Sequence, residues 1–484
     1  MTDRINLGDG ESVSQDSELD IDVIDALLPC RRFVVKYRVA ELGSVALVSE
    51  FMLRLVHTVE GISEREAGEY FGFADSEVAY VIDDVVALGF VERRNGTLWL
   101  TLAGRELFKP GDDMPQIFEM EIRTERHAFD LISLAPVEFT NLTTFDAVLP
   151  ELKVLPEKAA AASKLVPNAF RRHFDTLVRR VNKVPLRQSL CSVDSVTPLD
   201  RYAAIVPIRI KAKATVPGVV EPDVSDLWDG YDLDDRPEIV QATTELLKTA
   251  KMFGSDLDNV LFQCLSDVAP EVTADYTKGR SFRREAFFRD TARRAGELRR
   301  DRQTTPIVGS LWTDGNMARI QRALDYAMES RKPEDGVPPI LWHVPTRPLW
   351  GTSRRLPQLL RHFETTCGSW ADVDPGFSVA FVHDRPPRHI DRAFGAVLQS
   401  RAVARSLNHL EILLLPGLVA AVLVHASLVV GEAYPVQLGF ISFNESLLSR
   451  TSQLLSDLVM PFQVTRSSVD EGILRSKLEI SFGS

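Results

Sequence analysis

The sequence predicts a multidomain α/β protein, and three observations support this fold class. The chain has 484 residues, which is too long for one core of ordinary size. Between residues 44 and 108, apolar residues at helical spacing are followed by a hairpin pattern, and from Thr305 onward strand-like and helix-like segments alternate. We therefore expect an N-terminal helical unit (29–112), a middle α+β region (113–303) and a C-terminal α/β sheet covered by helices (304–484).

Residues 1–28 are expected to form an acidic disordered tail. The first 25 residues contain eight acidic residues, one arginine and no aromatic residue, so they supply −7 of the net charge of −12. A segment of this composition buries too little apolar surface to offset the entropy lost on ordering. The remainder of the chain is only mildly acidic.

Three amphipathic segments and a hairpin occupy residues 44–108. The segments VALVSEFMLRLVHTVEG, ISEREAGEYFGF and SEVAYVIDDVVALGF repeat apolar residues at helical spacing, and Ser63 is a suitable N-cap. Asn95-Gly96 joins two strand-like runs and is a strong hairpin signal. This order of elements resembles the winged helix-turn-helix family.

The resemblance implies that the third helix enters the major groove of DNA. The residues around this helix argue against it, because they include Asp75, Glu77 and Asp83 and no lysine or arginine. In this unit only Arg93 and Arg94, in the hairpin, have the positive charge and the position that contact with DNA phosphates requires. DNA and a protein partner therefore both remain open as ligands of the unit.

The middle region contains one acidic loop and one basic segment. The loop EPDVSDLWDGYDLDDRPE has eight acids but not the spacing of a calcium-binding EF-hand, so we interpret it as a solvated linker. The segment KGRSFRREAFFRDTARRAGELRRDR has ten basic residues against four acids, with Phe282, Phe287 and Phe288 between the arginines.

Two interpretations of the basic segment are open. It is either a nucleic-acid-facing helix that grips phosphate, or a surface helix with internal ion pairs such as Glu285 with Arg289 and Asp290 with Arg294. An acidic partner, including the acidic tail of this chain, is a further candidate for the first interpretation. The candidate nucleic-acid or partner contacts are Arg93, Arg94, Arg283, Arg284, Arg289, Arg293, Arg294, Arg299 and Arg300.

A run of nineteen residues without formal charge, Ile412–Val430, is long enough to be considered as a membrane span. Pro416-Gly417 is a turn signal and divides the run into two segments of strand length. We therefore expect two buried strands here and no membrane association. The segment HIDRAFGAVLQSRAVARSL, which precedes them, is expected to be a helix.

The stretch VLVHASLVVGEAYPVQLGFISFNES resembles the signature of the phospholipase D-like superfamily, which is H-x-K-x4-D followed by a Gly-Ser and an asparagine. His425, Ser427 and Glu432 occupy the positions of the histidine, lysine and aspartate. A two-residue insertion brings Ser442 and Asn444 into register with the last part of the signature, and we prefer this register to the unshifted one, which uses Gly439-Phe440.

The resemblance implies a phosphodiesterase site that has lost essential groups. In the family, the histidine attacks phosphorus, a second histidine protonates the leaving group, and the lysine and asparagine stabilise the phosphate charge. Ser427 cannot supply the positive charge of that lysine, and the chain contains no second H-x-K. Catalysis would therefore require a homodimer that pairs His425 with its copy.

Three functions follow as hypotheses. The first is a non-catalytic adaptor or regulator of a prokaryotic type that binds nucleic acid or a protein partner, such as a transcription regulator or an anti-phage defence subunit that acts beside an ATPase. The second is a dimeric phosphodiesterase or nuclease that uses His425, and the third is a purely structural subunit of a larger assembly.

The remaining motifs are negative. No Walker A sequence, dinucleotide-binding glycine motif, H-E-x-x-H or zinc-ligand spacing occurs, so we expect no cofactor and no metal. The four cysteines are scattered, and the first residues do not have the pattern of a signal peptide, which predicts a cytoplasmic protein.

Overall fold

The computed structural model describes most of the chain. The described residues are 18–42, 46–109, 114–115, 118–138, 141–181, 188–216, 218–224, 236–254, 258–279, 281–293, 298–332, 337–372, 376–400, 407–429 and 431–482. Residues 1–17 of the expected tail, most of the acidic loop and Arg294 lie outside these ranges. The described residues form helices and several sheets, which confirms a mixed α/β protein with more than one core.

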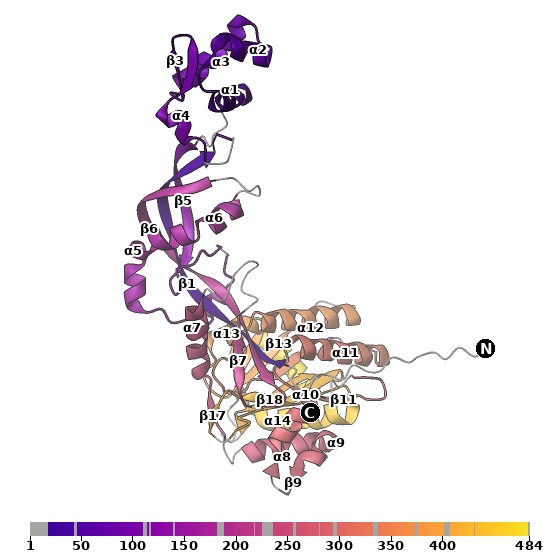
Figure 1. Cartoon of the computed structure of the whole chain (residues 1–484). Coiled ribbons are helices and arrows are strands. Elements are labelled where there is room, and N and C mark those ends of the chain that lie inside the picture. Colours follow the sequence, from indigo (N-terminus) through magenta and orange to yellow (C-terminus); the bar gives the residue numbers. More distant parts are fainter. Residues whose placement is uncertain are drawn as a thin grey trace, which may run out of the picture.

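Three parts succeed one another along the molecule (Figure 1). A small helical unit lies at one end, a strongly curved sheet in the middle, and a larger α/β part at the other end (Figure 1). Separate groups of buried apolar side chains form the core of the small unit and the core of the curved sheet, while two further groups cover the two faces of the C-terminal sheet.

The small unit contains the helices and the hairpin that the sequence predicts. Its elements are α1 (Leu47–Thr58), β2 (Ile62–Ser63), α2 (Glu64–Phe71), α3 (Asp75–Ala87), β3 (Val91–Arg94), β4 (Thr97–Leu100) and α4 (Leu102–Glu106). The strands form a sheet of order β2-β4-β3. Ser63 begins α2 with a capping box to Glu66, as its sequence context predicts. Asn95 and Gly96 both have positive φ, which the tight turn of the hairpin requires.

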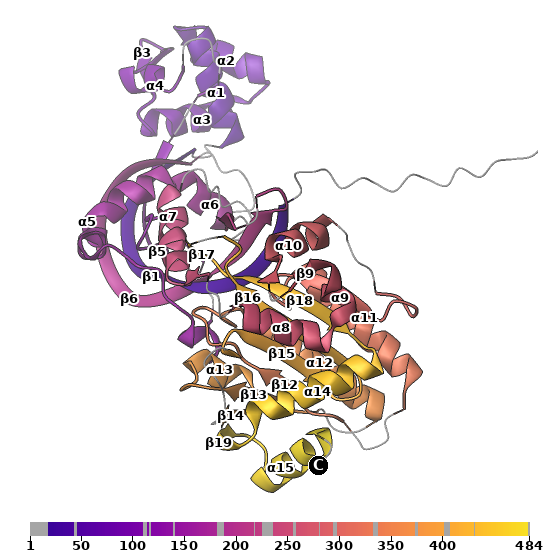
Figure 2. The same cartoon turned by 90° about the horizontal axis from the view of Figure 1, so that it is seen from below.

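The curved sheet consists of unusually long antiparallel strands. Its elements, in the order β5-β1-β6-β7, are β5 (Phe118–Asp130), β1 (Glu18–Leu42), β6 (Gln188–Lys213) and β7 (Val220–Asp223). The pairing of β1 with β6 has four register shifts, and Figure 2 shows the strong curvature of these strands. Helices α5 (Pro156–Arg172) and α6 (Phe174–Val181) follow β5 in the chain, and they cover this sheet at Phe33, Val35 and Tyr37.

Strand β1 corrects the expected extent of the acidic tail. Residues 18–28 were predicted to be disordered, but they form the first half of β1 and are largely buried. The acidic composition obscured an apolar pattern, because Ile21, Val23 and Ile24 lie between the carboxylates and pack into the C-terminal domain. Two of the carboxylates, those of Asp22 and Asp25, are buried with them.

The C-terminal domain is built on an eight-stranded mixed sheet of order β11-β18-β16-β15-β12-β13-β14-β19. Its strands are β11 (Thr304–Val308), β12 (Ile340–His343), β13 (Ser378–Val382), β14 (Ala396–Ser400), β15 (Leu410–Leu415), β16 (Val419–Ala426), β18 (Val436–Ser442) and β19 (Phe462–Ser467). Strands β12, β13 and β14 are parallel, and the other neighbours are antiparallel.

Helices cover both faces of this sheet. One face packs against α11 (Asp314–Ser330), α12 (Arg355–Ala371) and α13 (Arg388–Ala393). The other face packs against α8 (Asp258–Val268), α10 (Arg284–Arg293), α14 (Glu445–Val459) and α15 (Glu471–Phe482), while α7 (Pro237–Lys248) packs against β7 of the curved sheet. The short elements β8 (Met252–Phe253), α9 (Pro270–Thr273), β9 (Thr277–Lys278), β10 (Ser281–Phe282) and β17 (Glu432–Ala433) complete this part.

The apolar run from Ile412 forms two strands, as predicted. Strands β15 and β16 pair antiparallel across the turn at Pro416-Gly417, and both are fully buried. Among the described residues, no helix is both long enough and apolar enough to cross a bilayer.

The helix predicted over residues 389–407 is wrong over residues 394–400, and residues 401–406 lie outside the described ranges. The helix α13 ends at Ala393, and residues 396–400 form β14, which pairs with β13 and β19. Gly395 separates the two elements and packs closely on the backbone of Ser378, where a Cβ would lie 3.2 Å from the carbonyl oxygen. The apolar residues at helical spacing were in fact a buried strand, and short apolar runs do not distinguish the two.

Candidate functional site

Buried polar side chains gather at one edge of the C-terminal sheet. Strands β12 and β16 run in the same direction, and they end at this edge with His343 and with His425 next to the last residue. Strand β15 begins here, with Glu411 as its second residue, and the register pairs His425 with Gln437 of β18. The carboxyl ends of parallel strands are where open α/β sheets place their ligand sites.

His425 contacts a carboxylate rather than open space. Its Nε2 lies 2.6 Å from Oε2 of Glu411, and both side chains are fully buried. Glu411 also accepts hydrogen bonds from the indole nitrogens of Trp342 at 3.0 Å and Trp350 at 3.1 Å. The carboxylate of Glu411 therefore fixes His425 beside the indole rings of Trp342 and Trp350.

The protonation of this pair is set by burial. Burial raises the pKa of Glu411 to about 7, although hydrogen bonds from Trp350 and the charge of Arg347 oppose the shift. Burial, helped by the charge of Arg347, holds the pKa of His425 well below 6.5. His425 is therefore an uncharged imidazole near neutral pH.

A second buried group lies beside this pair. The guanidinium of Arg347 donates a hydrogen bond of 2.6 Å to Asp22 of β1, and both side chains are fully buried. Asp22 also accepts hydrogen bonds from the hydroxyl of Tyr434 at 2.9 Å and from the amide of Gln437 at 3.3 Å. The acidic first strand thus supplies the anion that neutralises Arg347.

Strand β1 closes this edge of the sheet. The backbone of Ser310 donates to Ile21, the indole of Trp312 donates to the carbonyl of Val23, and Asp25 donates through its backbone to Thr352. Gly309, with φ of +88°, lets the backbone of Ile21 approach so closely that a Cβ would lie 2.8 Å from its carbonyl oxygen. These contacts cover the polar cluster with backbone.

Four polar atoms of the cluster have no hydrogen-bond partner among the described residues. They are Nε of Arg347, Nδ1 of His409, Nδ1 of His425 and Oε1 of Gln437. Buried polar atoms without partners are uncommon in folded proteins. The cluster therefore has spare hydrogen-bonding capacity although it is closed.

A histidine pair lies further along the same edge. Nε2 of His343 and Nε2 of His383 are 2.5 Å apart, and Nδ1 of His343 contacts the carbonyl of Leu410 at 2.8 Å. Burial and the neighbouring His383 lower the pKa of His343 to about 3, so His343 is uncharged at neutral pH, and burial also lowers the pKa of His383. Within the described ranges, no group of three or more histidine, cysteine or acidic side chains is arranged to hold a metal ion.

The structure does not bring the five signature residues together. The hydroxyl of Ser427 donates to the carbonyl of Val429, and Glu432 is exposed on β17. Ser442 pairs with Ala420, five residues before His425 on β16. At about 3.3 Å per residue, Ser442 lies roughly 17 Å from His425 along the sheet.

Asn444 lies near Ser442 and has a structural role. Its side-chain oxygen accepts hydrogen bonds from the backbone of Ser446 and Leu447, so it is the N-cap of α14. The hydroxyl of Ser442 lies 2.8 Å from that of Thr304. The two residues that the preferred register adds to the signature, Ser442 and Asn444, are therefore the end of β18 and the N-cap of α14. Both lie at the edge of the sheet opposite His425.

Most of the predicted arginine contacts are engaged within the chain. Arg93 pairs with Glu64 at 2.8 Å and with Asp83 at 2.7 Å, and Arg94 pairs with Glu92. In the basic segment, Arg283 donates to the carbonyl of Asp275. Three ion pairs complete the set: Arg284 with Asp258 at 2.8 Å, Arg289 with Glu285 at 3.1 Å, and Arg300 with Glu329 at 2.6 Å.

The aromatic residues of the basic segment are also used internally. Phe282, Phe287 and Phe288 are buried in the core beside the C-terminal sheet and are not available for stacking on bases. Arg293 and Arg299 remain exposed. Where it is described, the segment therefore has internal ion pairs and a buried aromatic face, as the second interpretation predicts.

Sequence reasoning missed Asp22, Arg347, Glu411, Tyr434 and Gln437. One signal was present, because Glu411 interrupts the apolar run LEILLL and Asp22 interrupts a similar run. A charge inside a buried strand requires a partner. The partners themselves come from distant segments.

No protein-family model matches this chain, and comparisons with curated proteins and with solved structures also gave no match.

Proposed function

We propose that this protein is a non-catalytic adaptor that binds a protein partner through its small N-terminal unit. In this proposal the small unit is a winged helix and the C-terminal domain is a degenerate phospholipase D-like domain, of a prokaryotic type found in regulatory or defence assemblies. The observation that carries the proposal is the fully buried contact between His425 and Glu411.

The surroundings of His425 do not support nucleophilic catalysis. A nucleophile must reach the phosphorus atom, but the side chain of His425 has no exposed surface. Cleavage of a phosphodiester also needs cationic groups that stabilise the negative charge of the transition state. The nearby Arg347 is already neutralised by Asp22. Ser442 and Asn444 lie at the opposite edge of the sheet, so they cannot complete the site.

The surface of the small unit favours a protein over DNA. On α3, Tyr80 is 76% exposed, and Leu88, just after the helix, is 46% exposed. Exposed acids, Asp75, Glu77 and Asp83, lie on the same helix. Exposed aromatic and aliphatic side chains are typical of protein interfaces, whereas phosphates are repelled by carboxylates. A partner with apolar and basic side chains fits this surface.

A turnover experiment tests the absence of catalysis. Purified protein and the His425→Ala variant are incubated with single-stranded and duplex DNA and with a phosphodiester dye substrate. We expect no cleavage by either protein. Cleavage by the wild type that is lost in His425→Ala would overturn the proposal in favour of the dimeric phosphodiesterase.

A binding experiment tests the choice between DNA and protein. Labelled duplex DNA is titrated at low and at moderate salt with wild type and with an Arg93→Ala, Arg94→Ala double variant. We expect weak binding that is equal in both proteins. Salt-sensitive binding that the double variant abolishes would assign the unit to DNA.

Photo-crosslinking in the native cells identifies the partner surface. A photoreactive phenylalanine analogue is placed at Tyr80 and, as a control, at the equally exposed Phe253 of β8, which is 71% exposed. We expect a discrete crosslinked protein from position 80 and none from position 253. Identical products from both positions, or none from position 80, would contradict the assigned surface.

A further inference from the structure

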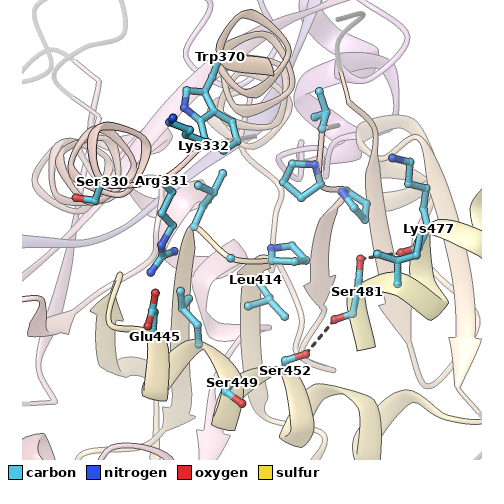
Figure 3. Close-up of a pocket in the computed structure, with 18 residues that line it drawn as sticks. Ser330, Arg331, Lys332, Trp370, Leu414, Glu445, Ser449, Ser452, Lys477 and Ser481 are labelled. Carbon is cyan, nitrogen blue, oxygen red and sulfur yellow. Dashed lines mark hydrogen bonds between the residues drawn. The ribbon is translucent and has the colours of Figure 1, made fainter. Parts of the chain in front are cut away.

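A large cavity lies at the edge of the C-terminal sheet opposite His425 (Figure 3). Its volume is about 790 Å³, and it lies beside the Pro416-Gly417 turn, between the end of α11 and the starts of β12 and α14. Volumes of about 300–1,000 Å³ are typical of sites for small organic ligands. The polar cluster around His425 takes no part in it, so the cavity is independent of the function proposed above.

The charged side chains of the cavity are mostly cationic. Arg331, Lys332 and Lys477 line it, and Glu445 is the only acidic residue among the described lining residues. Figure 3 shows Arg331 and Lys332 on one side of the cavity and Lys477 on the other. Among the lining residues that the structure describes, the charge balance therefore favours an anion.

Arg331 has unused hydrogen-bonding capacity. One of its terminal nitrogens donates to the carbonyl of Phe443 at 3.1 Å, while the other is buried and has no partner in the described structure. Burial lowers the pKa of Arg331, and the negative charge of the nearby Glu445 opposes this shift. A phosphate or carboxylate oxygen in the cavity supplies the missing partner once the side chain of Arg331 turns this buried nitrogen toward it.

A rigid aromatic wall lies next to these cations. The indole nitrogen of Trp370 donates to the carbonyl of Met328 at 3.3 Å, which fixes the orientation of the ring. Pro338, Leu418 and Ile480 extend the apolar lining. A flat ring can pack on such a wall, because offset stacking of aromatic groups is favourable.

We propose that this cavity binds a small organic anion that consists of a planar ring and a phosphate group, of the size of a nucleoside monophosphate. The phosphate contacts Arg331 and Lys332, and the ring packs against Trp370. Lys477 on the far side favours the same sign of charge.

Calorimetric titration of the full-length protein with AMP, adenosine and inorganic phosphate tests the proposal. We expect AMP to bind at least tenfold more tightly than adenosine and more tightly than phosphate, because only AMP uses both parts of the cavity. Absence of AMP binding at millimolar concentration, or adenosine binding as tight as AMP, would overturn the proposal.

Two variants locate the site and one controls for charge. We expect Arg331→Met and Lys332→Met each to weaken AMP binding at least tenfold. Arg361→Met removes one charge from α12 away from the cavity, and we expect it to bind AMP as wild type does. Equal affinity in all four proteins would place AMP elsewhere and overturn the assignment.

Two further measurements complete the test. Near-ultraviolet circular dichroism must match wild type in each variant, and Trp370→Leu is expected to weaken AMP binding while leaving phosphate binding unchanged. A single-stranded oligonucleotide with a 5′-phosphate is titrated in the same way. If it binds at the same residues at least tenfold more tightly than AMP, the ligand is the end of a nucleic acid and the small-molecule proposal is overturned.

Discussion

The carboxylate of Asp22 and the guanidinium of Arg347 lie 2.6 Å apart in the interior, although 325 positions separate them in the chain. This ion pair joins the first strand to the C-terminal domain. Neither group contacts solvent, and Tyr434 and Gln437 complete the hydrogen bonds of the carboxylate. The pair therefore fixes which residue of β1 lies over the edge of the sheet.

Asp22→Asn is expected to be strongly destabilising. The substitution leaves the buried charge of Arg347 without its counterion, and losses of about 3–5 kcal/mol are typical when one member of such a pair is removed. Urea unfolding followed by tryptophan fluorescence measures the change. Asp20→Asn is the control, because Asp20 pairs with Arg209 at 3.4 Å near the surface, and it should cost less than about 1 kcal/mol. Equal losses would show that the buried pair is not important for stability.

Glu411→Gln is expected to change how stability depends on pH. Burial raises the pKa of Glu411 from 4.5 to about 7, so the folded protein binds this proton more tightly than the unfolded chain. The stabilisation is complete below the unfolded pKa and is lost as the pH rises through the folded value. Relative to Glu411→Gln, wild type should therefore lose about 3 kcal/mol between about pH 5 and about pH 8.

The comparison with a variant is needed because the buried His343 and His425 change the stability of the fold with pH in the direction opposite to that of Glu411. Burial lowers the pKa of both, so protonation destabilises the fold as the pH falls below 6.5. The contribution of His343 cancels when wild type and Glu411→Gln are subtracted, whereas that of His425 is coupled to Glu411, which it contacts at 2.6 Å, and is part of the measured difference. The exposed Glu432→Gln variant controls for the loss of a carboxyl group, and a constant difference between wild type and Glu411→Gln at every pH would refute the prediction.

Gly439→Ala is expected to disrupt the C-terminal sheet. A Cβ at this position of β18 would lie 1.8 Å from the carbonyl oxygen of Val422 on β16, so the backbone must move. We expect a loss of more than about 4 kcal/mol, seen as a lower thermal midpoint and a lower soluble yield. Gly472→Ala is the control, because there the nearest atom is the flexible carboxylate of Asp470 at 3.0 Å. A wild-type midpoint for Gly439→Ala would show that these strands are not packed as described.

Phe287→Ala and Arg293→Ala distinguish the two faces of α10. Phe287 is fully buried, so its truncation should cost about 3–5 kcal/mol. Arg293 is exposed, so Arg293→Ala should change stability by less than about 0.5 kcal/mol. Thermal unfolding of both variants checks this, and a large loss only in Arg293→Ala would reverse the assigned faces.

Local signals predicted the elements of the small unit and the hairpin of the C-terminal sheet. Asn95-Gly96 and Pro416-Gly417 are turns whose backbone geometry depends on the residues themselves, so sequence alone identified them. The long strand β1 was missed, and so was its pairing with β6, which joins residues 18–41 to residues 188–213. No local pattern specifies a partner at that distance.

The polar cluster shows the same limit for the candidate site. His425 was singled out from the residues around it, but Glu411, which holds it, lies 14 positions earlier on a neighbouring strand. Asp22 was assigned to a disordered tail because its charge was weighed without its apolar neighbours. Burial and pairing decide the role of each of these groups, and both arise only when the sheet is assembled.

The location of β1 has a consequence for synthesis of the chain. At about 5–20 residues per second, a ribosome completes Arg347 roughly 15–65 s after Asp22. During that interval the apolar residues of the first strand are without their final neighbours. Asp20, Asp22 and Asp25 interrupt this apolar segment, and charges placed within apolar strands oppose aggregation. We therefore expect these carboxylates, of which Asp22 and Asp25 later become buried, to oppose aggregation of the nascent segment until the domain that receives it has been made.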